Sequence, residues 1–310
     1  MHRALALSLL AAACGGVNSA ADAPPAPPDA LIDSDWPHDD GPSPDAPAAR
    51  CSPTARFGTP VPLSALNSTA AEGPIYLTAD ELTAYFASTR AGGPGGYDIY
   101  VATRATTASA FSTPSLLNGV NSADTESRPV LTADGLTLYA EVKRGAAPYH
   151  LERATRTSTS GSFSALSPVT ALNSASSDVA PYVLPDHRAI YFVSGRGGDA
   201  AIYRSEGTGG TWGTPVLATG TNLQSPQSED YPAITDDELT IVFTSGRPGG
   251  TGGSDLYLAK RTSLAVGFDA PVELTEINTA SDEQPGWLSP DGCILYFSRA
   301  GDLFVATRGP

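Results

Sequence analysis

The sequence predicts an all-β protein made of five copies of one four-stranded unit. Glycine (31) and proline (27) are abundant while methionine occurs once, so turn-forming residues outnumber strong helix formers. A single pattern recurs every 49 to 56 residues, and each copy contains short runs in which apolar and polar residues alternate. No 3.6-residue periodicity accompanies the repeat, so an array of helices is not expected.

Four kinds of residue mark each copy at nearly constant spacing. An aromatic residue is followed ten positions later by asparagine, then by an acid five positions on (seven in the fourth copy), and after eight more residues by a turn aspartate. The aromatic residues are Phe57, Phe111, Phe163, Trp212 and Phe268, and the asparagines are Asn67, Asn121, Asn173, Asn222 and Asn278. The acids are Glu72, Glu126, Asp178, Glu229 and Glu283, and the aspartates are Asp80, Asp134, Asp186, Asp237 and Asp291.

The local chemistry divides each copy into four strands. A segment of the "TPV" type comes first, followed by a proline-containing run such as "RPVLT" and a tight turn such as "ADG". An alternating run such as "LTLYA", a glycine-rich hairpin and a strand of the "DIYVATR" type complete the copy. Four short antiparallel strands repeated in this way are typical of a β-propeller blade, and residues 51–310 are predicted to form the propeller.

The two ends of this domain predict how the ring closes. The chain ends on "DLFVATRGP" (302–310) with no fourth strand after it, whereas "FGTPVPL" (57–63) starts as a fourth strand with no blade before it. Pairing of the two completes five blades and removes exposed strand edges. Cys51 lies just before the closing strand and Cys293 lies in the blade that it completes, which predicts a disulfide. The alternative is a buried Cys293 and an unpaired Cys51.

Two stretches carry a resemblance to a known family. "QPGWLSPDGCILYFSR" and "RPVLTADGLTLYAEVKR" resemble the WD40-like (PD40) propeller repeat of the TolB family, and the resemblance covers about residues 57 to 310. It implies a propeller outside the cytoplasm that is used mainly for protein contacts. Related TolB-like domains often have six blades, so six blades are the alternative to five.

The N-terminal segment predicts export and anchoring. "MHRALALSLLAAAC" combines Arg3, an apolar run too short to span a bilayer and Cys14, and it resembles a lipoprotein signal peptide (1–14). Cys14 is the expected lipidation site, with ordinary cleavage near "NSAADA" as the alternative. Gly15 in place of aspartate implies the outer membrane, facing the periplasm or the cell surface. Residues 15–50, rich in proline and aspartate, are expected to form a disordered tether.

Charge and histidine content exclude several classes of partner. The formal net charge of −15 opposes binding to nucleic acid, and membrane contact is expected through the lipid anchor only. His150 and His187 are the histidines of the domain, and they lack the spacing of a zinc site. The tether motif "DSDWPHDD" lacks the order of a calcium loop. We therefore expect a monomer without metal or cofactor.

The repeated charged residues form the first group of candidate site residues. Acids on the loop before each proline strand and arginines in the glycine-rich hairpins are expected at one face of the propeller. These candidates are Glu72, Arg90, Asp98, Asp178, Arg196, Glu229, Arg247, Asp255 and Glu283. They could form a ligand-binding ring, or each arginine could tie its hairpin to the neighbouring loop. Repetition favours the structural role, because a catalytic site needs its residues once.

The second copy departs most from the pattern. Glu141, Lys143, Arg144, His150 and Glu152 stand where the other copies follow the common sequence. They predict a patch that faces a partner, and drift of a redundant repeat is the alternative.

These observations predict a lipid-anchored, non-enzymatic scaffold of the bacterial cell envelope. Its expected partner is an envelope protein or a peptidoglycan-associated molecule. The alternative is a carbohydrate-binding or glycoside-hydrolase-like propeller, which would use carboxylates at the channel mouth.

Overall fold

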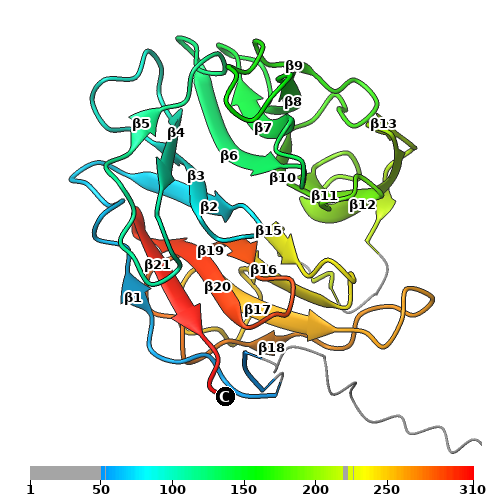
Figure 1. Ribbon diagram of the computed structural model, residues 1–310. Coiled ribbons are helices and arrows are strands. Elements are labelled where there is room, and N and C mark those ends of the chain that lie inside the picture. Colours follow the sequence, from blue (N-terminus) through cyan, green and yellow to red (C-terminus); the bar gives the residue numbers. More distant parts are fainter. Residues whose placement is uncertain (1–49, 53, 219–222, 226) are drawn as a thin grey trace, which may run out of the picture. The chain divides into compact units, whose positions relative to one another are not determined.

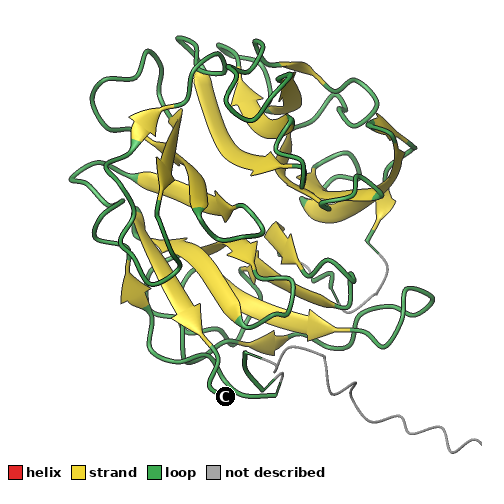
Figure 2. Cartoon of the chain, in the orientation of Figure 1, coloured by secondary structure: helices red, strands yellow, loops and turns green. Residues whose placement is uncertain are grey.

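The computed structural model describes residues 50–52, 54–218, 223–225 and 227–310, which belong to one compact unit. Strands joined by loops and turns make up this unit, and no helix occurs among its described residues (Figure 2). The same residues accordingly contain no helix that could cross a membrane. The predicted signal peptide with Cys14 and the predicted tether up to residue 49 lie outside the described residues.

Five antiparallel sheets account for the strands (Figure 1). The first strands are β2 (Glu72–Leu77), β6 (Thr125–Leu131), β10 (Asp178–Val183), β15 (Glu229–Ile234) and β19 (Glu283–Leu288). The second strands are β3 (Thr83–Ser88), β7 (Thr137–Lys143), β11 (Ala189–Ser194), β16 (Thr240–Ser245) and β20 (Ile294–Arg299). The third strands are β4 (Asp98–Thr103), β8 (His150–Thr155), β12 (Ala201–Thr208), β17 (Asp255–Lys260) and β21 (Asp302–Thr307). The fourth strands are β5 (Ser115–Leu116), β9 (Ser167–Pro168), β14 (Val216–Leu217), β18 (Val272–Glu273) and β1 (Val61–Pro62), and β13 (Thr211–Trp212) extends the third sheet.

The first strands line the centre of the ring. Each contacts the first strand of the next sheet, from β2 through β6, β10 and β15 to β19, and β19 contacts β2 again. This closed order confirms a propeller of five blades and not six. Aromatic side chains of the second strands, such as Tyr139 and Phe243, are completely buried between the blades.

Each turn between the first and second strands is built by an aspartate side chain. In the first blade Asp80 Oδ1 accepts hydrogen bonds from the Leu82 amide (2.9 Å) and the Thr78 hydroxyl (2.6 Å). The residue after this aspartate has a positive φ in every blade, for example 60° at Glu81 and 65° at Gly135. The predicted turn chemistry is therefore present, although three blades place a residue other than glycine in the left-handed region.

A second repeated arginine ends the third strand in four blades. Its Nε donates to a carbonyl of the preceding turn, and its guanidinium covers the aromatic residue that marks the repeat. Arg104, for example, donates to Glu81 O (2.7 Å) and lies 4.5 Å from the Phe111 ring centroid. The other three pairs are Arg156–Phe163, Arg261–Phe268 and Arg308–Phe57. The repeated aromatic residues thus anchor the outer edge of these four blades through cation–π contacts.

The strand directions define two ends of the central channel. Loops that lead into the first strands, and hairpins between the second and third strands, lie at one end, which we call the hairpin face. Turns between the first and second strands lie at the other end, which we call the turn face. The turn face carries the disulfide and Arg50, where the described chain begins.

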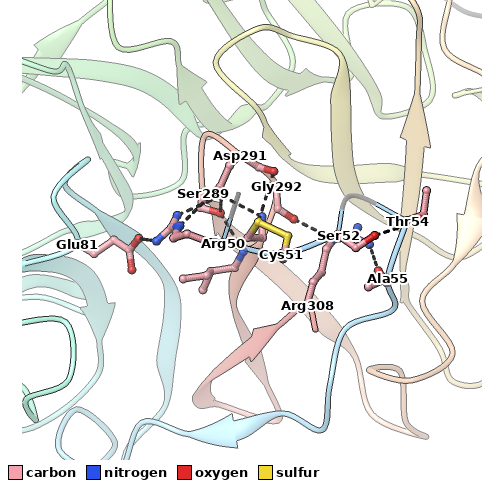
Figure 3. The surroundings of a disulfide bond; sticks show 12 residues. Arg50, Cys51, Ser52, Thr54, Ala55, Glu81, Ser289, Asp291, Gly292 and Arg308 are labelled. Atoms are coloured by element: carbon pink, nitrogen blue, oxygen red, sulfur yellow. Dashed lines mark hydrogen bonds and ion pairs between the residues drawn. A yellow bond between two sulfur atoms is a disulfide. The ribbon is translucent and has the colours of Figure 1, made fainter. Parts of the chain in front are cut away.

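The fifth blade is completed from the N-terminal side, as predicted. Val61 pairs with Val305 and Pro62 with Phe304, and an isolated bridge joins Phe57 to Arg308. Cys51 is bonded to Cys293 with the two Cα atoms 5.7 Å apart, so the predicted disulfide is present (Figure 3). The bond connects residues separated by 242 positions.

Arg50 adds an ionic contact beside the disulfide (Figure 3). Its Nε lies 2.7 Å from Asp291 Oδ2 in the fifth blade, and its Nη1 pairs with Glu81 of the first blade. Burial alone would raise the pKa of Asp291, but hydrogen bonds from Arg50 and Ser289 outweigh it and lower the pKa to about 2. The start of the domain is therefore fixed to the two blades that flank the ring closure.

Replacing both Cys51 and Cys293 with serine should lower the free energy of unfolding by about 2–5 kcal/mol, because the unfolded chain loses a long-range constraint. Urea unfolding at equilibrium measures the difference. The wild-type protein unfolded with a thiol reductant should match the variant. Equal unfolding midpoints with and without reductant would contradict the structural role of the bond.

Asp291→Asn should remove part of the acid sensitivity of the domain. Because the pKa of Asp291 is lower in the folded state, its stabilising effect is complete above about pH 4 and declines as the pH falls towards 2. The variant should be less stable than the wild type at pH 6, and this gap should narrow near pH 2. Arg50→Gln, which removes the other partner of the same ion pair, is the matched control. The difference in stability between this variant and the wild type should narrow over the same pH range. A gap that is constant from pH 6 to pH 2 would contradict the linkage.

Candidate functional site at the hairpin face

The repeated acids and arginines form internal locks within the blades. Arg90 Nη2 lies 2.9 Å from Glu72 Oε1, and the Glu72 side chain has no exposed surface. Arg90 also donates to the carbonyl of Leu66 in the loop that leads into β2. The same kind of ion pair joins Asp178 to Arg196 (2.8 Å), Glu229 to Arg247 (3.3 Å) and Glu283 to Arg299 (2.9 Å). Each arginine therefore ties its hairpin to the neighbouring loop, which is the structural role predicted by repetition.

The locked arginines also lie against aromatic rings. The Arg90 guanidinium carbon is 5.2 Å from the Phe86 ring centroid and 5.1 Å from that of Tyr100. Arg196, Arg247 and Arg299 repeat this arrangement in their own blades. Each of these arginines already contacts an acid and two aromatic rings of its own blade, so it is poorly placed to bind a ligand.

Asp98 and Asp255 do not join these ion pairs. Asp98 Oδ2 accepts a hydrogen bond from the Gly95 amide (3.2 Å), and Asp255 accepts from the Gly252 amide (3.1 Å). Both carboxylates thus stabilise their own glycine-rich hairpins, and burial raises the pKa of each. The contacts of Asp98 and Asp255 also fit the structural role that repetition favours over a ligand-binding ring.

The second blade lacks the lock. Burial raises the pKa of Glu126, and its side chain accepts hydrogen bonds from Ser122 in place of an arginine. Arg144, at the position of Arg90, pairs with Glu152 (2.6 Å) and Asp124 (3.3 Å). In the second blade the hairpin arginine therefore pairs with Glu152 and Asp124, and not with the repeated acid Glu126.

The predicted partner-facing patch on this blade is not a single surface. Glu141 is 6% exposed and Glu152 is 2% exposed, whereas Lys143 is exposed. His150 Nδ1 lies 4.0 Å from Asp178 Oδ2 of the next blade. The two buried acids require counter-charges, so each turns towards an arginine and not towards solvent. The patch prediction was therefore wrong for Glu141 and Glu152.

An irregularity of the inner strands creates a distinct site at this end of the channel. The pairing of the first and second strands is interrupted by a register shift in all five blades. In three blades the shift places a residue other than glycine at positive φ directly before a proline: Arg128 (53°), Ala180 (51°) and Tyr231 (56°). Such a conformation costs about 1–2 kcal/mol, and residues that keep it often serve a site.

Arg128 is the centre of this site. Its Nε lies 3.0 Å from Glu141 Oε1, and its Nη2 donates to Gln284 Oε1 (3.1 Å) of the fifth blade. Its guanidinium carbon lies 3.5 Å from the centroid of the Tyr231 ring in the fourth blade. Arg128 thus connects three blades across the mouth of the channel.

Glu141 is held from several directions. Oε1 accepts from the Ser127 hydroxyl (2.7 Å) as well as from Arg128, and Oε2 accepts from the Ala180 amide (2.8 Å). The ion pair is mostly buried, with 12% of the Arg128 side chain and 8% of the Glu141 side chain exposed. Both carboxylate oxygens are therefore used by the protein itself.

A cavity of about 290 Å³ opens next to this pair. It is lined by three tyrosines in addition to Arg128, Glu141 and Gln284: Tyr97, Tyr149 and Tyr231. Burial raises the pKa of the Tyr149 phenol, so it stays protonated at neutral pH. A neighbouring cavity shares Tyr97 and Gln284 and extends to Asp282. The mouth therefore presents aromatic rings with hydrogen-bonding groups at their edges.

Sequence reasoning identified Glu141 but missed the other residues of this cavity. Tyr97 and Tyr149 directly precede the third strand, where the other blades carry Ala200, Ser254 and Gly301. A comparison of the copies at this position would have shown the two tyrosines. Arg128 could have been found by the same comparison, since the residue two positions after the repeated acid is arginine in one blade only.

Comparisons with known proteins agree with the fold. No protein-family model matches the sequence, and no match was found among curated proteins. The structure is similar to an endo-arabinase from Bacteroides thetaiotaomicron, with a TM-score of 0.51 and 16% identity, over 81% of this chain and 96% of that chain. A thermostable family-43 glycoside hydrolase gives a TM-score of 0.50 at 13% identity, over 78% of this chain and 91% of that chain.

TolB, the family that the repeats resemble, is also among the structural neighbours. TolB from Acinetobacter baumannii gives a TM-score of 0.48 and 17% identity over 79% of this chain. The match covers 57% of that TolB chain, so this chain spans little more than half of its length. At these identities, the endo-arabinase and family-43 similarities, with TM-scores of 0.51 and 0.50, show a shared propeller fold and leave activity and partners open.

Arg128→Met should destabilise the domain by about 3 kcal/mol, because Glu141 then keeps a buried charge without its partner. The double variant Arg128→Met with Glu141→Gln should recover most of this loss, because the uncompensated charge is gone. Urea unfolding of both variants measures the difference. Equal stability of the single and double variants would show that the ion pair is not coupled.

Proposed function

We propose that this protein is a non-enzymatic binding propeller of the bacterial cell envelope. Its ligand contacts the mouth of the channel at the hairpin face. The three tyrosines and Gln284 provide the contact surface, and the Arg128–Glu141 pair holds that surface rigid. Tyrosine and arginine are the residue types that dominate protein interfaces, which supports an envelope protein or a peptidoglycan-associated molecule as the partner.

This proposal rests on the contacts that the protein itself makes with both carboxylate oxygens of Glu141. A glycosidase needs two carboxylates that act on opposite sides of one bond. Among the described residues, Glu141 is the acid that lines the cavity with the tyrosines, and both of its oxygens are engaged. An engaged carboxylate is a weak proton donor or nucleophile but a good structural support, so binding is favoured over hydrolysis.

The proposal also includes a lipid anchor at Cys14 and an outer-membrane location. It rests on the apolar run that ends in "LAAAC" and on Gly15 after the cysteine. Several acyl chains, at about 0.8 kcal/mol per buried methylene, would hold the protein stably at the membrane. The proline- and aspartate-rich sequence from residue 15 to 49 would then separate the propeller from the lipid surface.

A photo-crosslinking amino acid in place of Tyr97 tests the binding role. In native envelopes it should give a reproducible crosslinked product, because position 97 lines the proposed contact surface. The same amino acid at the exposed Ser160, on the turn face, is the matched control and should not give that product. Identical products from both positions would contradict binding at the hairpin face.

The enzymatic alternative is tested with the same purified protein. Incubation with a panel of arabinan, sialoside and peptidoglycan fragments should release no sugar, because both oxygens of Glu141, the acid that lines the three-tyrosine cavity, are engaged. Release of sugar by the wild type that is lost in Glu141→Gln would overturn the non-enzymatic assignment.

Cys14→Ala should abolish incorporation of radiolabelled palmitate and move the protein from the membrane fraction to the soluble fraction. Cys51→Ala, which leaves Cys14 in place, is the control and should keep the label. Labelling of the Cys14 variant would show that another residue carries the lipid, and an unlabelled wild type would show that the signal is cleaved elsewhere.

A further inference from the structure

A second cavity lies at the turn face of the channel. The last residues of the inner strands and the turns that follow them form its walls. Three aromatic side chains line it, Tyr76, Tyr182 and Trp287, together with one acid, Asp236. Its volume is about 30 Å³. This cavity shares no residue with the three-tyrosine cavity at the hairpin face.

Asp236 breaks the repeat at the first position of its turn. The other four blades carry Ala79, Ala133, Pro185 and Pro290 there, and all four residues line the same cavity. The neighbouring Asp237 is the repeated turn aspartate, so Asp236 is not needed to build the turn. The fold thus places one extra carboxylate among small and apolar side chains.

The Asp236 carboxylate has no ion pair within the described part of the chain. Burial raises its pKa, which means that its charged form is poorly solvated in the cavity. Arg188 is the nearby cation, but it donates to the backbone carbonyl of Asp236 and pairs with Asp186 (2.7 Å) and Glu238 (3.2 Å). A further cation beside Asp236 would therefore be stabilised.

The aromatic residues are fixed in position around this acid. The Tyr76 hydroxyl donates to Leu131 O (2.8 Å) and the Tyr182 hydroxyl donates to Leu288 O (3.4 Å). Trp287 packs edge to face on Tyr296, with ring centroids 5.8 Å apart. Because both hydroxyls are used by backbone carbonyls, the rings themselves are what the cavity offers. Aromatic rings around a carboxylate attract organic cations.

We propose that this cavity binds an alkylammonium group, which enters from the turn face and places its charge beside Asp236. A buried water needs about 10–15 Å³ of such space, so the cavity admits a head group of about two water volumes and excludes a whole sugar or nucleotide. Only the ammonium group and the first carbon of its stem need to enter.

The chain itself does not supply this group through its N-terminal segment. Residues 14 to 49 contain no lysine and no arginine. The two sources considered are a free alkylamine and a lysine side chain of another protein. Both sources share the same chemistry, and the experiment separates them.

Fluorine NMR of the full chain labelled with 5-fluorotryptophan provides the test. Three tryptophans are present, and Trp287→Phe assigns the resonance at the cavity. Butylammonium chloride should shift the Trp287 resonance in a saturable manner at millimolar concentration and leave Trp212 unchanged. Butanol at matched ionic strength is the uncharged control. A lysine-containing peptide, with its norleucine counterpart, is the second probe.

Asp236→Ala should weaken the binding of butylammonium at least tenfold. Because Ala79 and Ala133 occupy the same turn position in other blades, this variant is expected to fold, and thermal unfolding confirms it. Asp199→Asn, an exposed acid on a hairpin, is the matched control and should bind as the wild type does. Saturation with the lysine peptide as well points to a protein partner, and saturation with butylammonium alone points to a free amine. No saturable shift in the wild type, or the same affinity in Asp236→Ala, would overturn the proposal.

Discussion

The structure depends on pairing between the two ends of the domain. The fifth sheet has three strands from the C-terminal end of the chain and a fourth, β1, from its start. Without β1 the outer edge of β21 would be unpaired, and the contact of Phe57 with Arg308 would be lost. The inner strands can surround a channel only while this sheet is complete. Both mouths of the channel, and every residue that lines them, rely on that closure.

Residues that recur from blade to blade and residues that occur once lie in different parts of the ring. Arginines that recur, such as Arg90 and Arg104, bind loops and aromatic rings of their own blades. Residues that occur once, such as Arg128 in β6 and Asp236 in the turn after β15, line the two cavities of the channel. A repeat can tolerate such exceptions because its other copies keep the framework, so each blade is free to contribute a different side chain to the axis.

The sequence predicted the framework well because the framework is local and repeated. Four strands per copy, the closing strand and the disulfide all follow from spacing and from the unmatched ends. The channel mouth was harder to predict, because Arg128 and Gln284 are 156 residues apart and meet only when the ring closes. Glu141 was recognised as an exception, but its burial depends on a shift in strand register that no spacing shows. The cavity around Asp236 was also hard to predict, because the four other turns that line it come from different blades.

The position of the disulfide decides where a pull on the N-terminal segment would be borne. Cys51 comes before β1 along the chain and is joined covalently to the turn before the second strand of the fifth blade. Tension on the N-terminal segment would pass through this bond and through Arg50 into two blades, and the short β1–β21 pairing lies behind it. β1 has two residues, and a modest force could separate it from β21. The disulfide therefore protects this pairing from a pull on the N-terminal segment. A propeller held in this way can bear a pull on its N-terminal segment and still keep both channel mouths in shape.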